Sequence, residues 1–294
     1  MRIPLTKYGW PQVVIYPAVV LAIMVVFLLG TQGQLSLGSR LIGAGLLAVV
    51  LIWVLCFFRD PQRCCPSDRN VLLAPADGRV TDIETVEEND FIGGAALRIG
   101  IFLSIFDTHI NRAPCNVKVE KITYKKGKYK NAMNPQSGRV NESNDLHLVR
   151  IDSPQDRLIV RQISGAIARR IVCDKVEGRE LTGGQKFGMI KFGSRTELYV
   201  PLRLSSCVVR DASCAKGLTN QDTESTEKEL KLNSANSTAK KHTQHAIRNT
   251  QYEIKCLVQI GDKVKAGLTP LVKYEIRNPK HETNTNDQNT KSKT

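Results

Sequence analysis

The chain opens with two uncharged apolar runs, VVIYPAVVLAIMVVFLLG at Val13–Gly30 and LIGAGLLAVVLIWVLCFF at Leu41–Phe58. Each run has 18 residues, and an α-helix rises about 1.5 Å per residue, so each is near the short end of what spans a bilayer. The link between them, Thr31–Arg40, is short and polar. We therefore predict a two-helix transmembrane hairpin over residues 1–58, with spans of about 13–30 and 41–58.

A signal peptide is the alternative for the first run, and a pair of buried core helices is the alternative for both. No A-x-A cleavage site follows the first run, and a second run of equal length comes at once, which disfavours a signal peptide. Both alternatives stay open at this point.

The basic residues near the two runs predict the orientation. Arg2 and Lys7 precede the first run, Arg59 and Arg63 follow the second, and only Arg40 lies in the link. The positive-inside rule then places both ends of the hairpin in the cytoplasm. We expect a multi-pass protein of the cell membrane whose remaining chain is cytoplasmic.

The charge balance agrees with a membrane surface as the partner. The 294 residues include 42 Lys and Arg against 28 Asp and Glu, a formal net charge of +14, which favours an anionic leaflet. Nucleic acid would be the rival partner, but the chain has no helix-turn-helix, zinc-finger or ribonucleoprotein motif. None of the eight cysteines forms a C-x-x-C pair, so we predict no metal site.

Beyond Phe58 the sequence is typical of a mainly β domain. Short segments rich in Val, Ile and Leu alternate with Gly, Pro, Asp and Asn, and few windows show a helical period. We predict a β-sandwich or barrel-like catalytic domain at 59–277, anchored by the hairpin. The better strand candidates are Val71–Leu73, Arg79–Ile83, Ala96–Phe102, Val117–Tyr124, Leu146–Ile151, Leu158–Ile163 and Met189–Phe192, with Ile167–Val172 either strand or helical turn.

Two segments depart from this pattern. Residues 210–251 are dense in Ser, Thr, Asn, Gln and Lys, and such a composition does not bury enough apolar surface to offset chain entropy. We predict a flexible insertion at about 210–251 and a disordered tail at 278–294. Between them, Tyr252–Lys273 is predicted to run strand, Gly-Asp turn, strand, Ala-Gly turn, strand.

Three sites carry residues that could do chemistry, and each also has an ordinary structural interpretation. Asp77 lies in a turn, where aspartate usually caps its own backbone. His109 has an unperturbed pKa near 6.5 and could transfer protons, or it could be structural. Gly193-Ser194 follows an apolar strand, and a tight turn would explain the pair equally well.

Six blocks in order behind the apolar runs resemble phosphatidylserine decarboxylase in its short, archaeal-type form. The resemblance covers about residues 57–209 and 255–271. The blocks are FFRDPQR (57–63), PADGRV (75–80), FDTHINRAP (106–114), QISGAIARRIV (162–172), FGMIKFGSRTELYVP (187–201) and GDKVKAGLT (261–269).

The resemblance implies an enzyme that makes its own cofactor by cutting its chain between Gly193 and Ser194. Ser194 Oγ would attack the Gly193 carbonyl, and β-elimination of the resulting ester would leave an N-terminal pyruvoyl group at 194. The products would be a large chain, 1–193, and a small chain, 194–294. The pyruvoyl group would form a Schiff base with the substrate and act as an electron sink, converting phosphatidylserine, or the archaeal ether-lipid equivalent, to the ethanolamine lipid.

The resemblance also implies roles for three further residues. His109 matches the motif histidine and is the candidate for proton transfer, and Asp77 matches the acidic residue that would position the base during self-cleavage. The longer bacterial form has a second histidine where this chain has Arg112. Arginine does not act as a base at neutral pH, so Arg112 is instead the candidate that binds the substrate phosphate or carboxylate. His147, in DLHLV, is predicted to be a strand residue.

Two other classes of function remain to be separated from a membrane-bound lipid decarboxylase. One is a pyruvoyl-dependent decarboxylase of a soluble amino acid, which gives no reason for two spans. The other is a non-catalytic, membrane-anchored adaptor, which leaves Gly193-Ser194 within FGMIKFGSR unexplained. The lipid tail chemistry and the oligomeric state are not encoded in any motif.

Deleting Ser213–Asn249 is expected to leave the protein processed and active. Loop-closure free energy changes by only about 0.6 kcal/mol per doubling of loop length, and the composition predicts that this segment adds no core. On a denaturing gel the deletion should shrink only the small chain, because the predicted cut lies upstream. Loss of processing in a stably expressed deletion variant would contradict the domain prediction.

Overall fold

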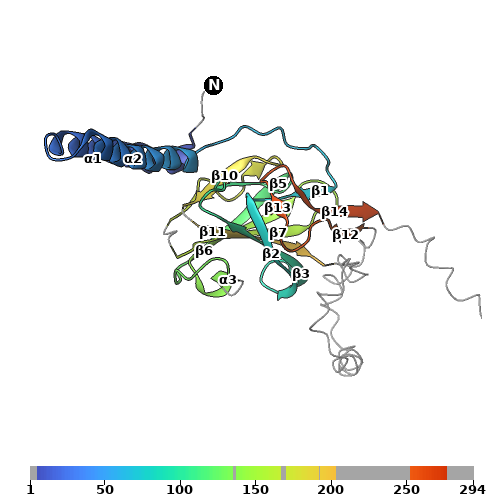
Figure 1. Ribbon diagram of the computed structural model, residues 1–294. Coiled ribbons are helices and arrows are strands. Elements are labelled where there is room, and N and C mark those ends of the chain that lie inside the picture. The colour runs from blue at the N-terminus through green and yellow to red at the C-terminus, as the bar shows by residue number, and fades with distance from the viewer. Residues whose placement is uncertain (1–4, 135–136, 167–169, 192, 203–251, 277–294) are drawn as a thin grey trace, which may run out of the picture.

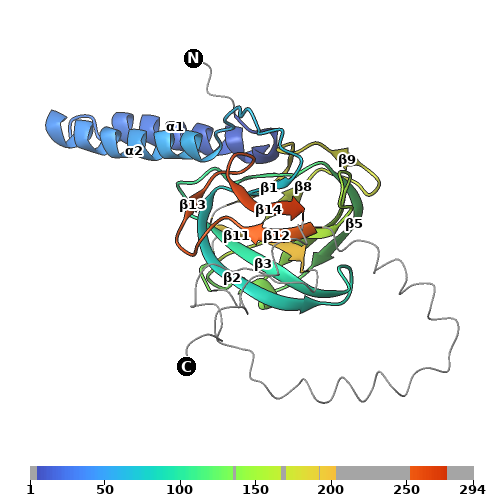
Figure 2. The same ribbon diagram turned by 90° about the vertical axis from the view of Figure 1, so that its right-hand side faces the viewer.

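The computed structural model describes residues 5–134, 137–166, 170–191, 193–202 and 252–276. It consists of a pair of long helices that project from one end of a β domain (Figures 1 and 2). The insertion predicted at 210–251 and the tail predicted at 278–294 lie outside the described residues.

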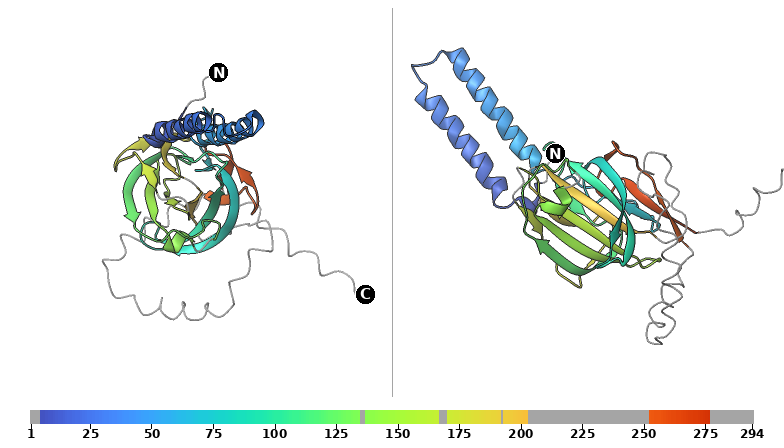
Figure 3. Two further views of the ribbon diagram at one scale, coloured as in Figure 1. Left: turned by 60° about the vertical axis from the view of Figure 1, so that its left-hand side comes forward. Right: turned by 90° about the horizontal axis from the view of Figure 1, so that it is seen from below.

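The two apolar runs form the long helices. A 3-10 turn, η1 (Lys7–Gly9), precedes α1 (Gln12–Gly30), and α2 (Leu37–Phe57) follows a short link. The two helices lie side by side (Figure 3). A Cβ added at Gly43 would collide with the Phe27 ring, so a glycine permits the close packing. Arg40 Nη2 donates to the Leu28 carbonyl at 2.8 Å, which places a cation at the C-terminal end of α1, where it is favourable.

Both helices are long and apolar enough to cross a membrane by length and composition. No side chain of α1 is buried, and α2 buries only Val54 and Phe57, close to its last residue. The helices therefore do not form a soluble core, and the alternative of two buried core helices is wrong.

The β domain is built mainly from one curled antiparallel sheet. Within the described residues this sheet has eight strands in the order β13-β2-β3-β11-β7-β6-β5-β9, and Figure 3 shows how it curls around the core. The strands are β2 (Gly78–Glu88), β3 (Gly94–Leu103), β5 (Val117–Lys125), β6 (Ser143–Arg150), β7 (Arg157–Ile163), β9 (Glu180–Leu181), β11 (Ser194–Pro201) and β13 (Lys263–Val264).

Two three-stranded antiparallel sheets complete the described domain. One has the order β1-β14-β12 and the other the order β4-β10-β8. Their strands are β1 (Val71–Leu73), β4 (Ile110–Arg112), β8 (Ile171–Cys173), β10 (Lys186–Ile190), β12 (Tyr252–Cys256) and β14 (Pro270–Ile276). The short helix α3 (Ser137–Val140) precedes β6.

The large core lies inside the curled sheet. It is formed by Val, Ile, Leu and Phe side chains of all three sheets, among them Ile101, Val160, Phe187 and Leu198, each with at most 1% of its surface exposed. A second cluster joins the helices to the β domain. It consists of Tyr8, Val54, Phe57, Phe58 and Met189, and we call it the helix-base cluster.

The expectation of a mainly β domain behind two apolar helices is confirmed. Strand Val71–Leu73 has the predicted bounds, and Tyr252–Lys273 contains the predicted strands and the two turns at Gly261 and Gly267. Residues 171–172 are strand, whereas 167–169 lie outside the described residues. Strand β11 and the short β4 next to His109 were not predicted.

Strand β11 carries a charged group that is wholly inside the protein. Arg195 is fully buried, and its Nε donates to Glu197 Oε1 at 2.8 Å. Its Nη1 donates to Thr81 Oγ1 at 2.7 Å, and its Nη2 donates to the Asp82 carboxylate. A buried ion pair is tolerated only with such complete pairing, because both charges lose their water. These contacts fasten β11 to β2 across β3.

The substitution Gly100→Ala is expected to destabilise the protein by about 3 kcal/mol or more, the cost of breaking a buried pair. A Cβ at this position of β3 would overlap the Arg195 guanidinium and approach Asp82 Oδ1 to 2.6 Å. Thermal unfolding in detergent micelles measures the effect. Gly45→Ala is the matched control, since an added Cβ there meets nothing within 4 Å. An unchanged midpoint in Gly100→Ala would contradict the importance of this pair.

Candidate active site

The Gly193-Ser194 pair lies at the junction where β10 has ended and β11 begins. Gly193 has φ of +61°, in the left-handed region that residues with a side chain enter rarely. Ser194 is the first residue of β11 and pairs with Leu103 of β3. The strand therefore fixes Ser194, and the left-handed glycine turns the peptide before it.

The carbonyl of Gly193 lies against the backbone of Gly165. A Cβ added at Gly165 would collide with Gly193 O, so only glycine at 165 allows this approach. Gly165 is part of the QISGAIARRIV block, but no function was predicted for it. A glycine after a buried strand was the available signal, since such a residue often marks a close backbone approach.

The Ser194 side chain is buried and has no hydrogen-bond partner in the part of the chain that the structure describes. The residue is 0% exposed, and Ser194 Oγ bonds to no group among the described residues. A buried hydroxyl without a partner is costly and points to a catalytic or strained position. Ser194 thus presents a free nucleophilic oxygen next to the Gly193 carbonyl carbon.

His109, the residue directly before β4, contacts the same peptide. Its Nε2 accepts a hydrogen bond from Gly193 N–H at 3.3 Å, and its Nδ1 lies 2.9 Å from the Asp107 carbonyl oxygen. The carbonyl requires a proton on Nδ1 and the N–H requires a lone pair on Nε2. Both contacts therefore fit one neutral tautomer, with the unprotonated nitrogen directed at the Gly193-Ser194 pair.

The surroundings keep His109 neutral. The residue is 0% exposed, and its ring lies 4.6 Å, centroid to centroid, from Phe57 of the helix-base cluster. Burial lowers the pKa of His109 to about 4, and the Arg59 guanidinium acts in the same direction, against the opposing effects of Asp107 and Asp77. His109 is consequently unprotonated near neutral pH.

Asp77 is held by an ion pair. Both of its carboxylate oxygens accept from Arg63, at 2.6 and 2.7 Å, and Oδ1 also accepts from Ala266 N–H at 2.8 Å. Both ring nitrogens of His109 are hydrogen-bonded to other groups. Asp77 therefore acts on the histidine only by electrostatic attraction at a distance. Arg63, which follows the second apolar run, and Ala266, in GDKVKAGLT, were not predicted as its partners.

Arg112 is buried, and its guanidinium donates to two backbone carbonyls. Nη1 bonds to Gly184 O and Nη2 to Pro61 O, each at 3.0 Å. Burial lowers the pKa of Arg112, and the neighbouring Arg63 adds to this effect. These contacts tie the segment after α2 to the β domain, and substrate binding by Arg112 stays a prediction.

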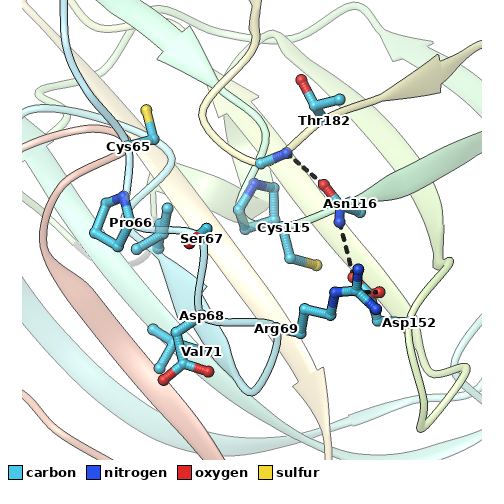
Figure 4. A pocket seen from close by; sticks show the side chains of 13 residues that line it. Cys65, Pro66, Ser67, Asp68, Arg69, Val71, Cys115, Asn116, Asp152 and Thr182 are labelled. Carbon is cyan, nitrogen blue, oxygen red and sulfur yellow. Dashed lines mark hydrogen bonds and ion pairs between the residues drawn. The ribbon is translucent and has the colours of Figure 1, made fainter.

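A separate cavity of about 290 Å³ lies beside the segment 65–71. Cys65, Arg69, Cys115, Asn116 and Asp152 are among the residues that line it (Figure 4). None of Asp77, His109, Arg112, Gly193 and Ser194 lines this cavity. Within the described residues, no three His, Cys, Asp or Glu side chains gather as metal ligands.

Comparison with known proteins identifies the class of enzyme. A phosphatidylserine decarboxylase family model matches residues 50–219. The chain is 45% identical over 158 residues to a phosphatidylserine decarboxylase proenzyme of Carboxydothermus hydrogenoformans, covering 53% of this chain and 73% of the relative. It is 41% identical over 202 residues to the proenzyme of that name from Symbiobacterium thermophilum, covering 68% and 87%, respectively.

These matches define a carboxy-lyase. The chain belongs to the phosphatidylserine decarboxylase family, which confirms the resemblance found in the sequence. The narrower assignment to a short, archaeal-type form stays a prediction.

The substitution Gly165→Ala is expected to slow chain cleavage by roughly 10- to 100-fold, since a displacement of about 1 Å at reacting atoms has effects of this size. The added methyl group would push the Gly193 carbonyl out of place. The measurement is the fraction of cut chain against time on a denaturing gel.

The matched control is Gly183→Ala, where an added Cβ meets its nearest atom at an ordinary 3.4 Å. Equal cleavage rates in the two variants would contradict a role for the Gly165 contact.

Proposed function

We propose that this chain decarboxylates phosphatidylserine to phosphatidylethanolamine with a pyruvoyl group made from its own Ser194. The observation that carries the proposal is the hydrogen bond from Gly193 N–H to His109 Nε2 beside the free, buried Ser194 Oγ. Nucleophile, base and a left-handed glycine carbonyl meet at one peptide bond. The proenzyme names of the relatives support a step of this kind.

In the proposed self-cleavage, His109 Nε2 takes the proton of Ser194 Oγ as the oxygen attacks the Gly193 carbonyl. For this step Ser194 Oγ replaces Gly193 N–H at the Nε2 lone pair. His109 returns this proton to the Ser194 nitrogen as the C–N bond of the Gly193-Ser194 amide breaks, which leaves an ester between Gly193 and Ser194 Oγ and a free Ser194 amine. Loss of the Ser194 α-proton expels the Gly193 carboxylate and leaves dehydroalanine, and water then releases ammonia and leaves the ketone.

The burial of His109 suits this role. A pKa of about 4 leaves the imidazole unprotonated at neutral pH, so its lone pair is available before the reaction starts. Asp77 is proposed to support the protonated imidazole through its field, because it contributes favourably to that charge. The ion pair with Arg63 holds the Asp77 carboxylate in place.

The pyruvoyl group supplies the electron sink for loss of the substrate carboxylate. The residues around it would exclude water and handle the proton. Ser194, Leu103 and His109 are each 0% exposed, which makes this end of β11 a dry environment. Decarboxylation consumes one proton from solvent, and His109 Nε2, unprotonated at rest, is proposed to take up this proton and pass it to the carbon that loses the carboxylate.

The cut is expected to leave the two chains associated, as 1–193 and 194–294. Strand β11 of the small chain pairs with β3 through eight positions and with β7 through five, and both partners belong to the large chain. Strand β14 pairs with β1 and β13 with β2 in the same way. Separation of the chains would break all of these ladders.

We further propose that α1 and α2 form a transmembrane hairpin, as domain 1–58, that anchors the catalytic domain 59–277 at the cytoplasmic face of the cell membrane. The support is their length, their apolar surface and the positions of Arg59 and Arg63 after α2. Such an anchor places the site next to a phospholipid substrate.

Replacing Ser194 by alanine is expected to abolish both cleavage and decarboxylation, because alanine has no oxygen to form the ester. A denaturing gel should show one band and the activity assay no product. Ser67→Ala, which removes an exposed serine hydroxyl, should give two bands and normal activity. Two bands from Ser194→Ala would contradict the assigned cleavage site.

His109→Gln is expected to slow cleavage by about 10²- to 10⁴-fold, the usual contribution of a general base. Glutamine retains much of the size and some hydrogen bonding of histidine but accepts no proton. His147→Gln is the matched control, since His147 lies in β6 and packs against Phe91 at 4.7 Å. Normal cleavage in His109→Gln would leave His109 a structural residue only.

A further inference from the structure

A second cavity, of about 310 Å³, lies where α1 meets the β domain. Its lining includes Lys7, Tyr8, Trp10, Arg170, Asp174 and Lys191, and we call it the foot pocket. Residues 7–10 are separated only by Pro11 from Gln12, the first residue of α1, and Lys191 directly follows β10. The pocket is therefore at the level at which the proposed membrane anchor begins.

Two cations face each other in this pocket without an acidic partner. Strands β8 and β10 are antiparallel with Ile171 opposite Ile190, and Lys191 N–H donates to Arg170 O at 3.1 Å. Like charges at opposed positions of neighbouring strands repel each other. Lys191 is nevertheless 3% exposed, and its Nζ donates to Gln12 Oε1 at 2.8 Å. Among the described residues neither cation forms an ion pair.

The acidic group of the pocket is already neutralised by other residues. Asp174 accepts from Lys7 Nζ at 2.7 Å and from Tyr8 OH at 3.2 Å, and Lys175 Nζ lies 2.8 Å from it. Burial alone would raise the pKa of Asp174, but the two ammonium groups lower it below its ordinary value. Burial and Arg170 both lower the pKa of Lys191. The charge that the pocket lacks is therefore an anion.

The foot pocket is close to the reacting peptide along two routes. Lys191 precedes Ser194 by three residues, and three residues span at most about 10 Å. The helix-base cluster borders both places, because Tyr8 lines the pocket and Phe57 contacts His109. Trp10 lines the pocket and is 66% exposed, and tryptophan favours the membrane–water interface.

We infer that the foot pocket binds the phosphodiester of the substrate phospholipid through Arg170 and Lys191, while the serine end of the headgroup reaches residue 194. The inference rests on the proposed function. A phosphodiester offers the anionic oxygens that guanidinium and ammonium groups bind. Its acyl chains would leave past Trp10 toward α1. Free inorganic phosphate shares this chemistry and is the other source of such an anion.

The test uses the full, cleaved enzyme in detergent micelles with a short-chain phosphatidylserine. Arg170→Gln and Lys191→Gln are each expected to raise KM about 10-fold, as for loss of one charge-assisted hydrogen bond, with kcat within about twofold of the wild type. The matched control, Lys263→Gln, removes an exposed charge on β13 and should leave both constants unchanged. Arg170 is exposed, so its variant decides the test if Lys191→Gln fails to fold.

Inorganic phosphate as a competitor separates the two sources of the anion. We expect phosphate to inhibit the wild type only at concentrations far above the KM of the lipid. At lower phosphate concentrations, Arg170→Gln and Lys263→Gln should both show no inhibition. Inhibition at concentrations near that KM, lost in Arg170→Gln, would overturn the assignment to a lipid phosphodiester. An unchanged KM in both Arg170→Gln and Lys191→Gln, with the enzyme still active, would contradict binding of the phosphodiester in the foot pocket. Absence of decarboxylation in the wild type would instead contradict the proposed function.

Discussion

The pairing of β11 along both of its edges is the constraint on which the site depends. Residues of this strand are hydrogen-bonded to β3 on one side and to β7 on the other, and Arg195 fastens it to Asp82 of β2. Ser194 is the first residue of this fixed strand, whereas Gly193 before it has a left-handed conformation. The Ser194 end of the Gly193-Ser194 peptide is thus fixed in the strand. The Gly193 end is turned so that the Gly193 carbonyl oxygen lies against Gly165.

The surroundings keep His109 neutral, and an ion pair fixes the nearby Asp77. Phe57 packs against the His109 ring, and burial among the strands lowers the pKa of His109. Each carboxylate oxygen of Asp77 accepts a hydrogen bond from a different guanidinium nitrogen of Arg63. This bidentate geometry fixes both groups. When the neutral His109 takes up a proton, the imidazolium is a charge inside an apolar interior, which is costly without compensation. The negative charge of Asp77 offsets part of that cost.

Much of the fold could be predicted from the sequence, because its signals are local. The apolar runs define the helices, and alternating patterns with Gly turns define Val71–Leu73 and 252–276. Strand β11 was missed because SRTELYVP reads as a charged surface segment. Arg195 and Glu197 are in fact fully buried, since each is the other's partner, and composition alone does not reveal such pairing.

The candidate site was predictable only where its residues belong to local sequence motifs. Gly193, Ser194, His109 and Asp77 belong to motif blocks, and the structure brings His109 to Gly193. The partners of these residues come from distant parts of the chain. Gly165 contacts Gly193 through a backbone approach, and Ala266 binds Asp77 across 189 positions. Contacts of this kind follow from the topology of the sheet and have no sequence period.

Self-cleavage between Gly193 and Ser194 is tested most directly by the intact mass of both chains after purification from membranes. We expect a large chain that ends at Gly193 with a free carboxylate. We also expect a small chain that begins at residue 194 and is lighter than the serine-started sequence by one ammonia. A single uncut chain of full mass in an active preparation would contradict the account, as would a small chain that begins with unmodified Ser194.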